Sequence, residues 1–200
     1  MNLPPPIERL ASRLAELPSI GPRQAIRLAF YLVSLGQNDV SALASDLENL
    51  KNIKICANCF FIHQNSGSLC QFCGDHKRRK DLITLVEKET DLISIENTKR
   101  FNGRYLILGP ISKTGVLEEW QNLRLQSLKS FIQKELSGKA EEIILALNPT
   151  SNGDWHASLI AKELTPLTKK ISRLGRGLPT GGEIEFADDE TLGAALTRRD

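Results

Sequence analysis

Cys56-Ala57-Asn58-Cys59 and Cys70-Gln71-Phe72-Cys73 contain every cysteine of this 200-residue chain, with ten residues between the two pairs. A Cys-x-x-Cys pair places two thiolates on one tight turn. Two such turns supply the four tetrahedral sulfur ligands that a structural zinc ion requires. The spacing therefore predicts a four-cysteine zinc finger with one Zn²⁺ per chain. The predicted ligands are Cys56, Cys59, Cys70 and Cys73.

Two disulfides, or four ordinary buried thiols, are the alternatives to a metal at these cysteines. Disulfides need an oxidising compartment, and the segment Met1 to Leu17 lacks the apolar stretch of a signal peptide. His63 lies between the two pairs, where it could replace a cysteine, but we expect it to be a solvated loop residue. A closed all-cysteine site leaves no open position for a substrate, so its predicted role is structural.

Composition and charge indicate an ordinary soluble globular protein. Apolar residues make up 40% of the chain, charged residues 25%, and the net charge is +2. No apolar run is long enough to span a membrane, so we expect a cytoplasmic, nucleoid-associated protein without a membrane partner. Positive charge is concentrated locally, in Lys77-Arg78-Arg79-Lys80 and in the first thirty residues. Such basic runs suit contact with nucleic acid, but they are also common on solvated surfaces.

The segment before the cysteines, residues 6–52, has the apolar periodicity of helices. Leu17-Pro18-Ser19-Ile20-Gly21-Pro22 interrupts this pattern, and the second helix is predicted to begin at Pro22. The interruption resembles the helix-hairpin-helix motif of DNA-binding proteins, with Ser19 where that motif usually has a second glycine. Its glycine turn leaves backbone N–H groups at a helix N-terminus, where they and the helix dipole attract phosphate.

Arginines on these helices can add positive charge to the same phosphate site. Arg23 and Arg27 lie one helical turn apart, and Arg9 and Arg13 precede them on the first helix. Together with Gly21 they are the predicted DNA-binding residues. Binding of this kind contacts the DNA backbone and reads no sequence. The alternative is a packed pair of helices whose arginines simply face solvent.

From residue 81 onward, strands alternate with helices. Continuous apolar strands separated by helices indicate a parallel sheet that is covered on both faces. The predicted strands are 82–86, 105–108, 143–147 and 170–174, and the predicted helices are 118–136 and 153–165. Ligands of such sheets bind at the carboxyl ends of the strands.

Polar residues follow two of these strand ends. Glu87 follows the first strand, with Asp91 four residues later, and Asn148 follows the third, with Asp154 just beyond. Carboxylates from two strand ends can hold Mg²⁺, while phosphate oxygens and water complete its octahedron. A glycine-rich stretch, 175–182, could approach phosphates, but the chain has no P-loop motif.

The order of these motifs resembles the RecR family of bacterial recombination mediators over nearly the whole chain. Glu87 with Asp91 resembles the first motif of a Toprim domain, and Asn148-Pro149-Thr150 occupies the place of that domain's Asp-x-Asp motif. Further matching strings are Ile20-Gly21-Pro22-Arg23, Gly103-Arg104-Tyr105 and Arg176-Gly177-Leu178-Pro179. The implied domains are a helix-hairpin-helix domain (1–53), a four-cysteine zinc finger (54–79), a Toprim domain (80–175) and a glycine-rich C-terminal segment with a helix (176–200).

The resemblance implies a non-catalytic mediator of recombinational DNA repair. Members of this family form rings, often homotetramers, that are wide enough for DNA. They act with RecO and RecF to load recombinase onto gapped or single-stranded DNA coated by single-strand-binding protein. The resemblance also assigns Glu87, Asp91, Asn148 and Asp154 to an acidic or partner-binding site of the Toprim domain.

The chain departs from the family pattern after Asn148-Pro149-Thr150, where Ser151-Asn152-Gly153-Asp154 contains a single acidic residue. Asn148 and Thr150 replace two carboxylates of catalytic Toprim enzymes, which should weaken Mg²⁺ binding sharply. The alternative function is a catalytically active Toprim enzyme, such as a Mg²⁺-dependent nuclease or a topoisomerase-like protein. That chemistry needs the missing carboxylates or a suitably placed tyrosine nucleophile.

Overall fold

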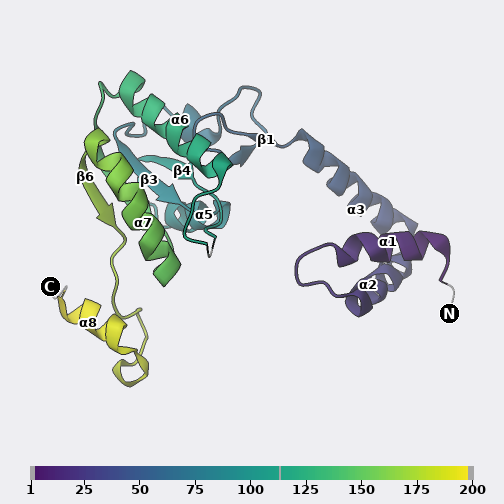
Figure 1. Ribbon diagram of the computed structural model, residues 1–200. Coiled ribbons are helices and arrows are strands. Elements are labelled where there is room, and N and C mark those ends of the chain that lie inside the picture. Colours follow the sequence, from purple (N-terminus) through teal and green to yellow (C-terminus); the bar gives the residue numbers. More distant parts are fainter. Residues whose placement is uncertain (1–2, 113, 198–200) are drawn as a thin grey trace. The chain divides into compact units, whose positions relative to one another are not determined.

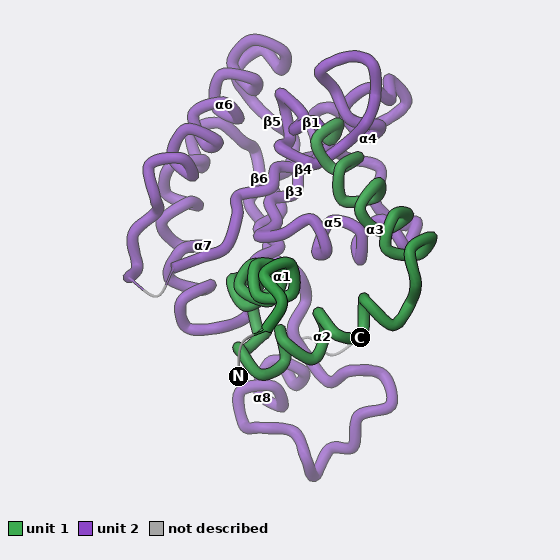
Figure 2. The backbone as a smooth tube through the Cα atoms, turned by 90° about the vertical axis from the view of Figure 1, so that its right-hand side faces the viewer, with its two compact units in different colours: residues 1–53 green, residues 54–200 purple. Residues whose placement is uncertain are grey.

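A computed structural model describes residues 3–112 and 114–197 of the chain. It contains two compact units, Met1–Ile53 and Lys54–Asp200, which Figure 2 shows in different colours. Each unit has its own core. The finer division into four domains stays a prediction from the sequence.

The first unit is helical, as the apolar periodicity predicts. Its helices are α1 (Pro5–Ala15), α2 (Pro22–Leu35) and α3 (Gln37–Asn49), followed by a short 3-10 turn, η1 (Leu50–Asn52). Pro22 is the first residue of α2, as expected for a proline that fixes φ and lacks an N–H. Gly36 separates α2 from α3 with φ of 90°, a conformation that favours glycine.

The core of the first unit is small. Among residues 3–53, the buried ones are three alanines, Ala11, Ala25 and Ala29, and they bring α1 and α2 close together. Larger apolar side chains of α2 and α3 remain exposed in the single chain. They include Phe30, Tyr31, Val33, Leu43 and Leu47. Little apolar surface is therefore removed from water within this unit, so its stability as an isolated unit should be low.

The second unit begins with the cysteine segment. Two short antiparallel strands, β1 (Lys54–Ile55) and β2 (Ile62–His63), form a hairpin around the first Cys-x-x-Cys pair. The second pair lies at the start and in the body of the one-turn helix α4 (Gln71–Gly74). We call residues 54–79 the cysteine module.

A four-stranded parallel sheet follows, in the order β4-β3-β5-β6. This confirms the predicted fold class. The strands are β3 (Leu82–Val86), β4 (Arg104–Ile107), β5 (Ala140–Ala146) and β6 (Thr168–Arg173). The helices are α5 (Glu89–Asn97), α6 (Glu119–Glu135), α7 (Ser151–Leu164) and α8 (Asp189–Thr197), with 3-10 turns η2 (Thr165–Leu167) and η3 (Ile184–Phe186). The sequence patterns did not predict α5.

The sheet is covered on both faces, and strand alternation decides which side chain faces which layer. Ile83 and Leu85 of β3 pack with α6 and α7, whereas Val86 packs with α5 and the cysteine module. Figures 1 and 2 show α6 and α7 side by side on one face of the sheet and α5 on the other. The carboxyl ends of β3 and β5 therefore meet at one edge, beside the starts of α5 and α7.

Candidate functional site

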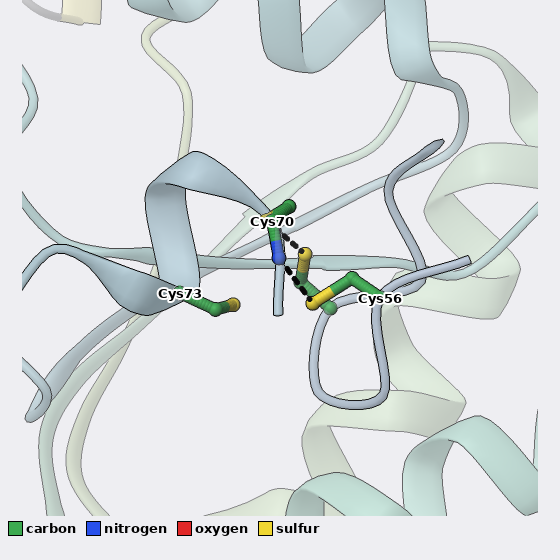
Figure 3. Close-up of side chains that lie close together, drawn as sticks. Cys56, Cys70 and Cys73 are labelled. Carbon is green, nitrogen blue, oxygen red and sulfur yellow. Dashed lines mark hydrogen bonds between the residues drawn. The ribbon is translucent and has the colours of Figure 1, made fainter. Parts of the chain in front are cut away.

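The four cysteine side chains converge on one point. Their sulfur atoms all lie within 4.8 Å of one another, and all four residues are buried. The Sγ atoms of Cys59 and Cys70 are 3.4 Å apart, and the backbone N–H of Cys70 donates to Sγ of Cys56 at 3.4 Å. Figure 3 shows Cys56, Cys70 and Cys73 approaching this point from the two turns. All four thiols are free, so this geometry does not contain a disulfide.

The cluster fits a tetrahedral metal ion. Zinc–sulfur bonds of about 2.3 Å place tetrahedral sulfurs roughly 3.8 Å apart, close to the spacing found here. Across residues 3–112 and 114–197, this is the one group of three or more His, Cys, Asp or Glu ligand atoms gathered so closely. His63 is not part of it. The expectation that His63 is solvated was wrong, because its side chain is buried in β2 and Nδ1 accepts from the N–H of Asn65 at 3.2 Å.

The four buried thiols shift one another's pKa values. Hydrogen bonding, first of all with Cys59, holds the pKa of the Cys56 thiol well below its ordinary value. The same contact with Cys56, reinforced by the other two cysteines and by burial, raises the pKa of Cys59. Four buried thiolates repel one another, so full deprotonation requires a cation among them. The donor set and its burial thus favour a bound divalent metal over free thiols.

The cysteine module is joined directly to the edge strand of the sheet. The backbone N–H of Ile107 on β4 donates to the carbonyl of Cys59 at 2.9 Å. Phe60, which follows Cys59 with a φ of 65°, places its ring 4.8 Å from the guanidinium of Arg124 on α6. These contacts tie the first Cys-x-x-Cys turn to β4 and α6, and they cover part of the free edge of β4.

The basic run after the last cysteine is largely neutralised by neighbours. Arg78 forms a half-buried ion pair with Glu96 at 2.5 Å, Arg79 pairs with Asp81 at 3.1 Å, and Lys80 approaches Glu135 at 3.4 Å. Each of these three cations therefore has an acidic partner within the chain. Their partners lie on α5, at the start of β3 and on α6, so the run fastens the cysteine module to the sheet layer.

The predicted acidic site of the Toprim region has a different geometry from a metal site. Oε1 of the buried Glu87 accepts from the backbone N–H of Asn148 at 2.8 Å, which joins the end of β3 to the end of β5. Oδ2 of Asp91 accepts from the N–H of Lys88 at 3.0 Å, at the start of α5. In the described part of the chain, Glu87, Asp91 and Asp154 do not gather into a group of ligand atoms.

Asp154 forms ion pairs with two arginines that the sequence patterns did not identify as its partners. Arg173, the last residue of β6, and Arg176, just beyond it, both form ion pairs with Oδ1 of Asp154. These contacts, Arg176 first, hold the pKa of the Asp154 carboxyl below its ordinary value. A cleft of about 290 Å³ lies beside them, and its lining includes Asp91, Asn148, Arg173 and Arg176. Two arginine side chains of the chain itself therefore lie at the strand ends where a Toprim enzyme needs its metal.

The predicted DNA-binding residues surround the start of α2. Gly21 is the N-cap of this helix, and in the described part of the chain no side chain caps its first N–H groups. The first turn of α2 has no acidic residue, and Arg23 and Arg27 are exposed. The start of α2 is thus exposed and uncapped, and two exposed arginines lie within its first two turns, a combination that attracts phosphate.

Arg9 and Arg13 lie on α1, also exposed. They line a shallow surface hollow together with Glu8 and Glu16, and Arg13 pairs with Glu16 at 3.5 Å. The acidic neighbours reduce the positive charge that this face of α1 presents. Arg23 and Arg27 are therefore the stronger candidates for phosphate contact.

The folds and the metal-type cluster define a class: a Toprim protein with an N-terminal helix-hairpin-helix unit and a tetracysteine module. Family models match the chain in three places, as a RecR helix-hairpin-helix (residues 7–51), a Toprim domain (81–175) and a RecR C-terminal segment (177–199).

Curated relatives extend this match to nearly the full chain. Proteins named "Recombination protein RecR" from Dehalococcoides mccartyi and Chloroflexus aurantiacus are each 38% identical, over 96% and 97% of this chain and 93% of their own lengths. The protein of the same name from Frankia alni is 36% identical over 96% of this chain and 95% of its own length. This chain belongs to the RecR family of recombination proteins.

Proposed function

We propose that this protein is a non-catalytic DNA-binding mediator of recombinational repair. The observation that carries the proposal is the uncapped N-terminus of α2 with Arg23 and Arg27 exposed beside it, in a chain of the RecR family. The proposed contacts are with backbone phosphates, so they suit gapped and single-stranded DNA of any sequence. The protein acts in the cytoplasm, in association with the nucleoid. None of the helices in the described ranges combines the length and apolar character needed to cross a bilayer.

The Toprim sheet supports a non-catalytic role. Two-metal phosphoryl chemistry needs several free carboxylates around each ion. Here Glu87 accepts a hydrogen bond from the backbone N–H of Asn148, and Asp91 accepts one from the backbone N–H at the start of α5. Asp154 forms ion pairs with two arginines. We propose that this edge binds a protein partner rather than Mg²⁺. Its adjacent cleft and mixed charge suit RecO, with RecF as a further partner.

The cysteine module is proposed to hold one structural Zn²⁺ per chain through Cys56, Cys59, Cys70 and Cys73. When bound, the ion supplies folding free energy to a segment whose own strands have only two residues each. The cysteines bind and orient; their burial excludes water and leaves no open coordination position.

A homotetrameric ring is the proposed assembly. The exposed apolar side chains of α2 and α3, which include Phe30, Tyr31 and Leu47, support burial against another copy. Ring closure around DNA would present the α2 arginines of several copies at once and raise avidity. Such a clamp suits the loading of recombinase onto DNA coated by single-strand-binding protein.

DNA binding is tested by fluorescence anisotropy with labelled gapped and single-stranded DNA. Arg23→Glu with Arg27→Glu should weaken binding on the order of 10- to 100-fold, because two charge-assisted phosphate contacts are lost. The salt dependence should flatten by about 0.9 per lost contact on duplex DNA. The loss should be equal for unrelated sequences.

A matched control makes the same change of charge in the other unit. Arg100→Glu with Lys139→Glu alters two exposed cations of loops in residues 54–200 and should leave affinity near the wild-type value. Equal affinity of the α2 variant and the wild type at low salt would exclude the α2 site. Native mass spectrometry and a RecO pull-down then test the tetramer and the partner separately.

A further inference from the structure

Arg104, the first residue of β4, is a buried cation without a carboxylate partner. Its residue exposure is 6%, and across residues 3–112 and 114–197 no acidic oxygen lies within ion-pair distance of it. Its Nη1 donates to the backbone carbonyl of Cys73 at 2.8 Å, while its buried Nε has no hydrogen-bond partner. The neighbouring arginine of the module, Arg78, is instead paired with Glu96.

A buried, unpaired charge is unfavourable unless something nearby offsets it. The ring of Phe131 lies 5.9 Å from the guanidinium of Arg104, at the outer limit of a useful cation–π contact. The carbonyl of Cys73 supplies a partial charge only. The hydrogen bonds and rings around Arg104 therefore leave most of its charge without compensation.

The missing negative charge lies at the cysteines once a metal is bound. Four thiolates around a divalent ion leave two negative charges uncompensated. Cys73 is one of these four ligands, and its own carbonyl accepts from Arg104. We propose that Arg104 is the internal counter-cation of the metal tetrathiolate and that it positions the Cys70–Cys73 turn against strand β4. This inference rests on the proposed zinc occupancy.

An external anion is a weaker explanation for the same arginine. A pocket of about 240 Å³ lies beside Arg104, lined also by His76, Lys80 and Glu135. Lys80 in this pocket is already paired with Glu135. An anion bound there would also face the negative tetrathiolate, so the electrostatics favour the internal counter-ion.

The proposal makes the contribution of Arg104 to stability depend on whether the metal is bound. With zinc bound, the charge of Arg104 stabilises the metal centre. Without zinc, the four cysteines no longer form a tetrathiolate complex of fixed geometry, so Arg104 loses this partner. Metal loss therefore destabilises the edge strand as well as the cysteine module.

The test compares full-length wild type with Arg104→Met, Arg104→Lys and the surface control Arg100→Met. Zinc content is measured by elemental mass spectrometry, and zinc release is followed with a chromophoric chelator. Arg104→Met should weaken zinc binding roughly 10- to 100-fold, the range typical for loss of an outer-shell partner, and should release zinc correspondingly faster. Arg104→Lys should release zinc at a rate between those of the wild type and Arg104→Met, and Arg100→Met should release it at the wild-type rate. Release from Arg104→Met within twofold of wild type would overturn the inference.

Thermal denaturation separates charge compensation from simple packing. Arg104→Met should lower the melting temperature of the zinc-loaded protein by more than it lowers that of the protein stripped of zinc. Equal lowering in both states would overturn the inference, and so would stabilisation of the wild type by inorganic phosphate that is absent in Arg104→Met. A wild type without zinc would instead refute the proposed metal centre itself. If Arg104→Met does not fold, Arg104→Lys is tested in the same two states.

Discussion

Ser19 adopts a backbone conformation that glycine tolerates better than any other residue. Its φ is 65°, in the hairpin between α1 and α2, at the position where the helix-hairpin-helix motif usually has a glycine. The left-handed conformation costs a residue with a Cβ about 1–2 kcal/mol. The serine at this position therefore stores strain in the turn.

Replacing Ser19 by glycine should stabilise the first unit by about 0.5–1 kcal/mol, because relief of the strain exceeds the added entropy of the unfolded chain. Ser19→Ala is the matched control, since it keeps the Cβ and should not stabilise. Hydrogen exchange of the α1 and α2 amides measures the change. Equal protection in both variants would contradict the strain argument.

Asp154, for which the sequence predicts a metal role, instead forms ion pairs with two neighbouring arginines. Its pKa is lowered by Arg176 and Arg173, so the ion pairs are complete above the ordinary Asp value of about 3.9. They are lost as the pH falls through the lower pKa of the folded protein.

The carboxyl carbon of Asp154 should therefore titrate below about pH 4 in an NMR experiment. Arg173→Gln with Arg176→Gln should return the midpoint toward about 3.9, because both cations are removed. Wild-type titration at or above the ordinary value would show that the ion pairs do not form in solution.

At the scale of elements, the ends of β3 and β5 are joined through one side chain. Glu87 is buried and accepts from the backbone N–H of Asn148. Parallel strands bring these residues together although 61 positions separate them in the chain. The glutamate that a Toprim enzyme would use for metal binding here satisfies a backbone donor.

Glu87→Ala should lower the free energy of unfolding of the second unit by about 1–3 kcal/mol, because it leaves a backbone donor unsatisfied. Glu87→Gln should retain most of the stability, since its side-chain carbonyl can accept the same hydrogen bond. Denaturant unfolding measures both. A Mg²⁺-dependent rise in wild-type stability, lost in both variants, would instead indicate a metal role.

At the scale of the whole molecule, the two units differ in how they are stabilised. The first has a core of three alanines, whereas the second combines a covered sheet with the cysteine cluster. The module is fastened to the sheet by the Ile107–Cys59 hydrogen bond and by the Arg78–Glu96 pair. Metal binding should thus be coupled to the second unit and have no direct effect on the helices of the first.

Removal of the proposed zinc ion by a chelator should expose the amides of residues 54–79 and of β4 to hydrogen exchange. Protection of α1 and α2 should stay unchanged, which serves as the internal control. Readdition of zinc should restore protection, because the ligand set reforms with the metal. Uniform loss of protection across both units would show that the metal centre supports the entire chain.

The sequence by itself determined the features that depend on local spacing. Two Cys-x-x-Cys turns predict the cluster, because each pair lies within one turn of chain. Continuous apolar runs predict the parallel sheet, and Pro22 marks the start of α2. The helix α5 escaped prediction because its nine residues show little apolar periodicity.

Only the tertiary structure decided how the charged residues are used. Arg78 reaches Glu96 across 18 positions, and Arg173 reaches Asp154 across 19. Neither separation matches the periodicity of a helix or a strand, so the sequence does not reveal these pairs. The sheet order and the docking of the cysteine module bring the partners together. Arg104 could not be recognised as an unpaired cation before its burial was known. Side-chain chemistry is fixed by the sequence, but its electrostatic surroundings are created by residues that meet only when the chain folds.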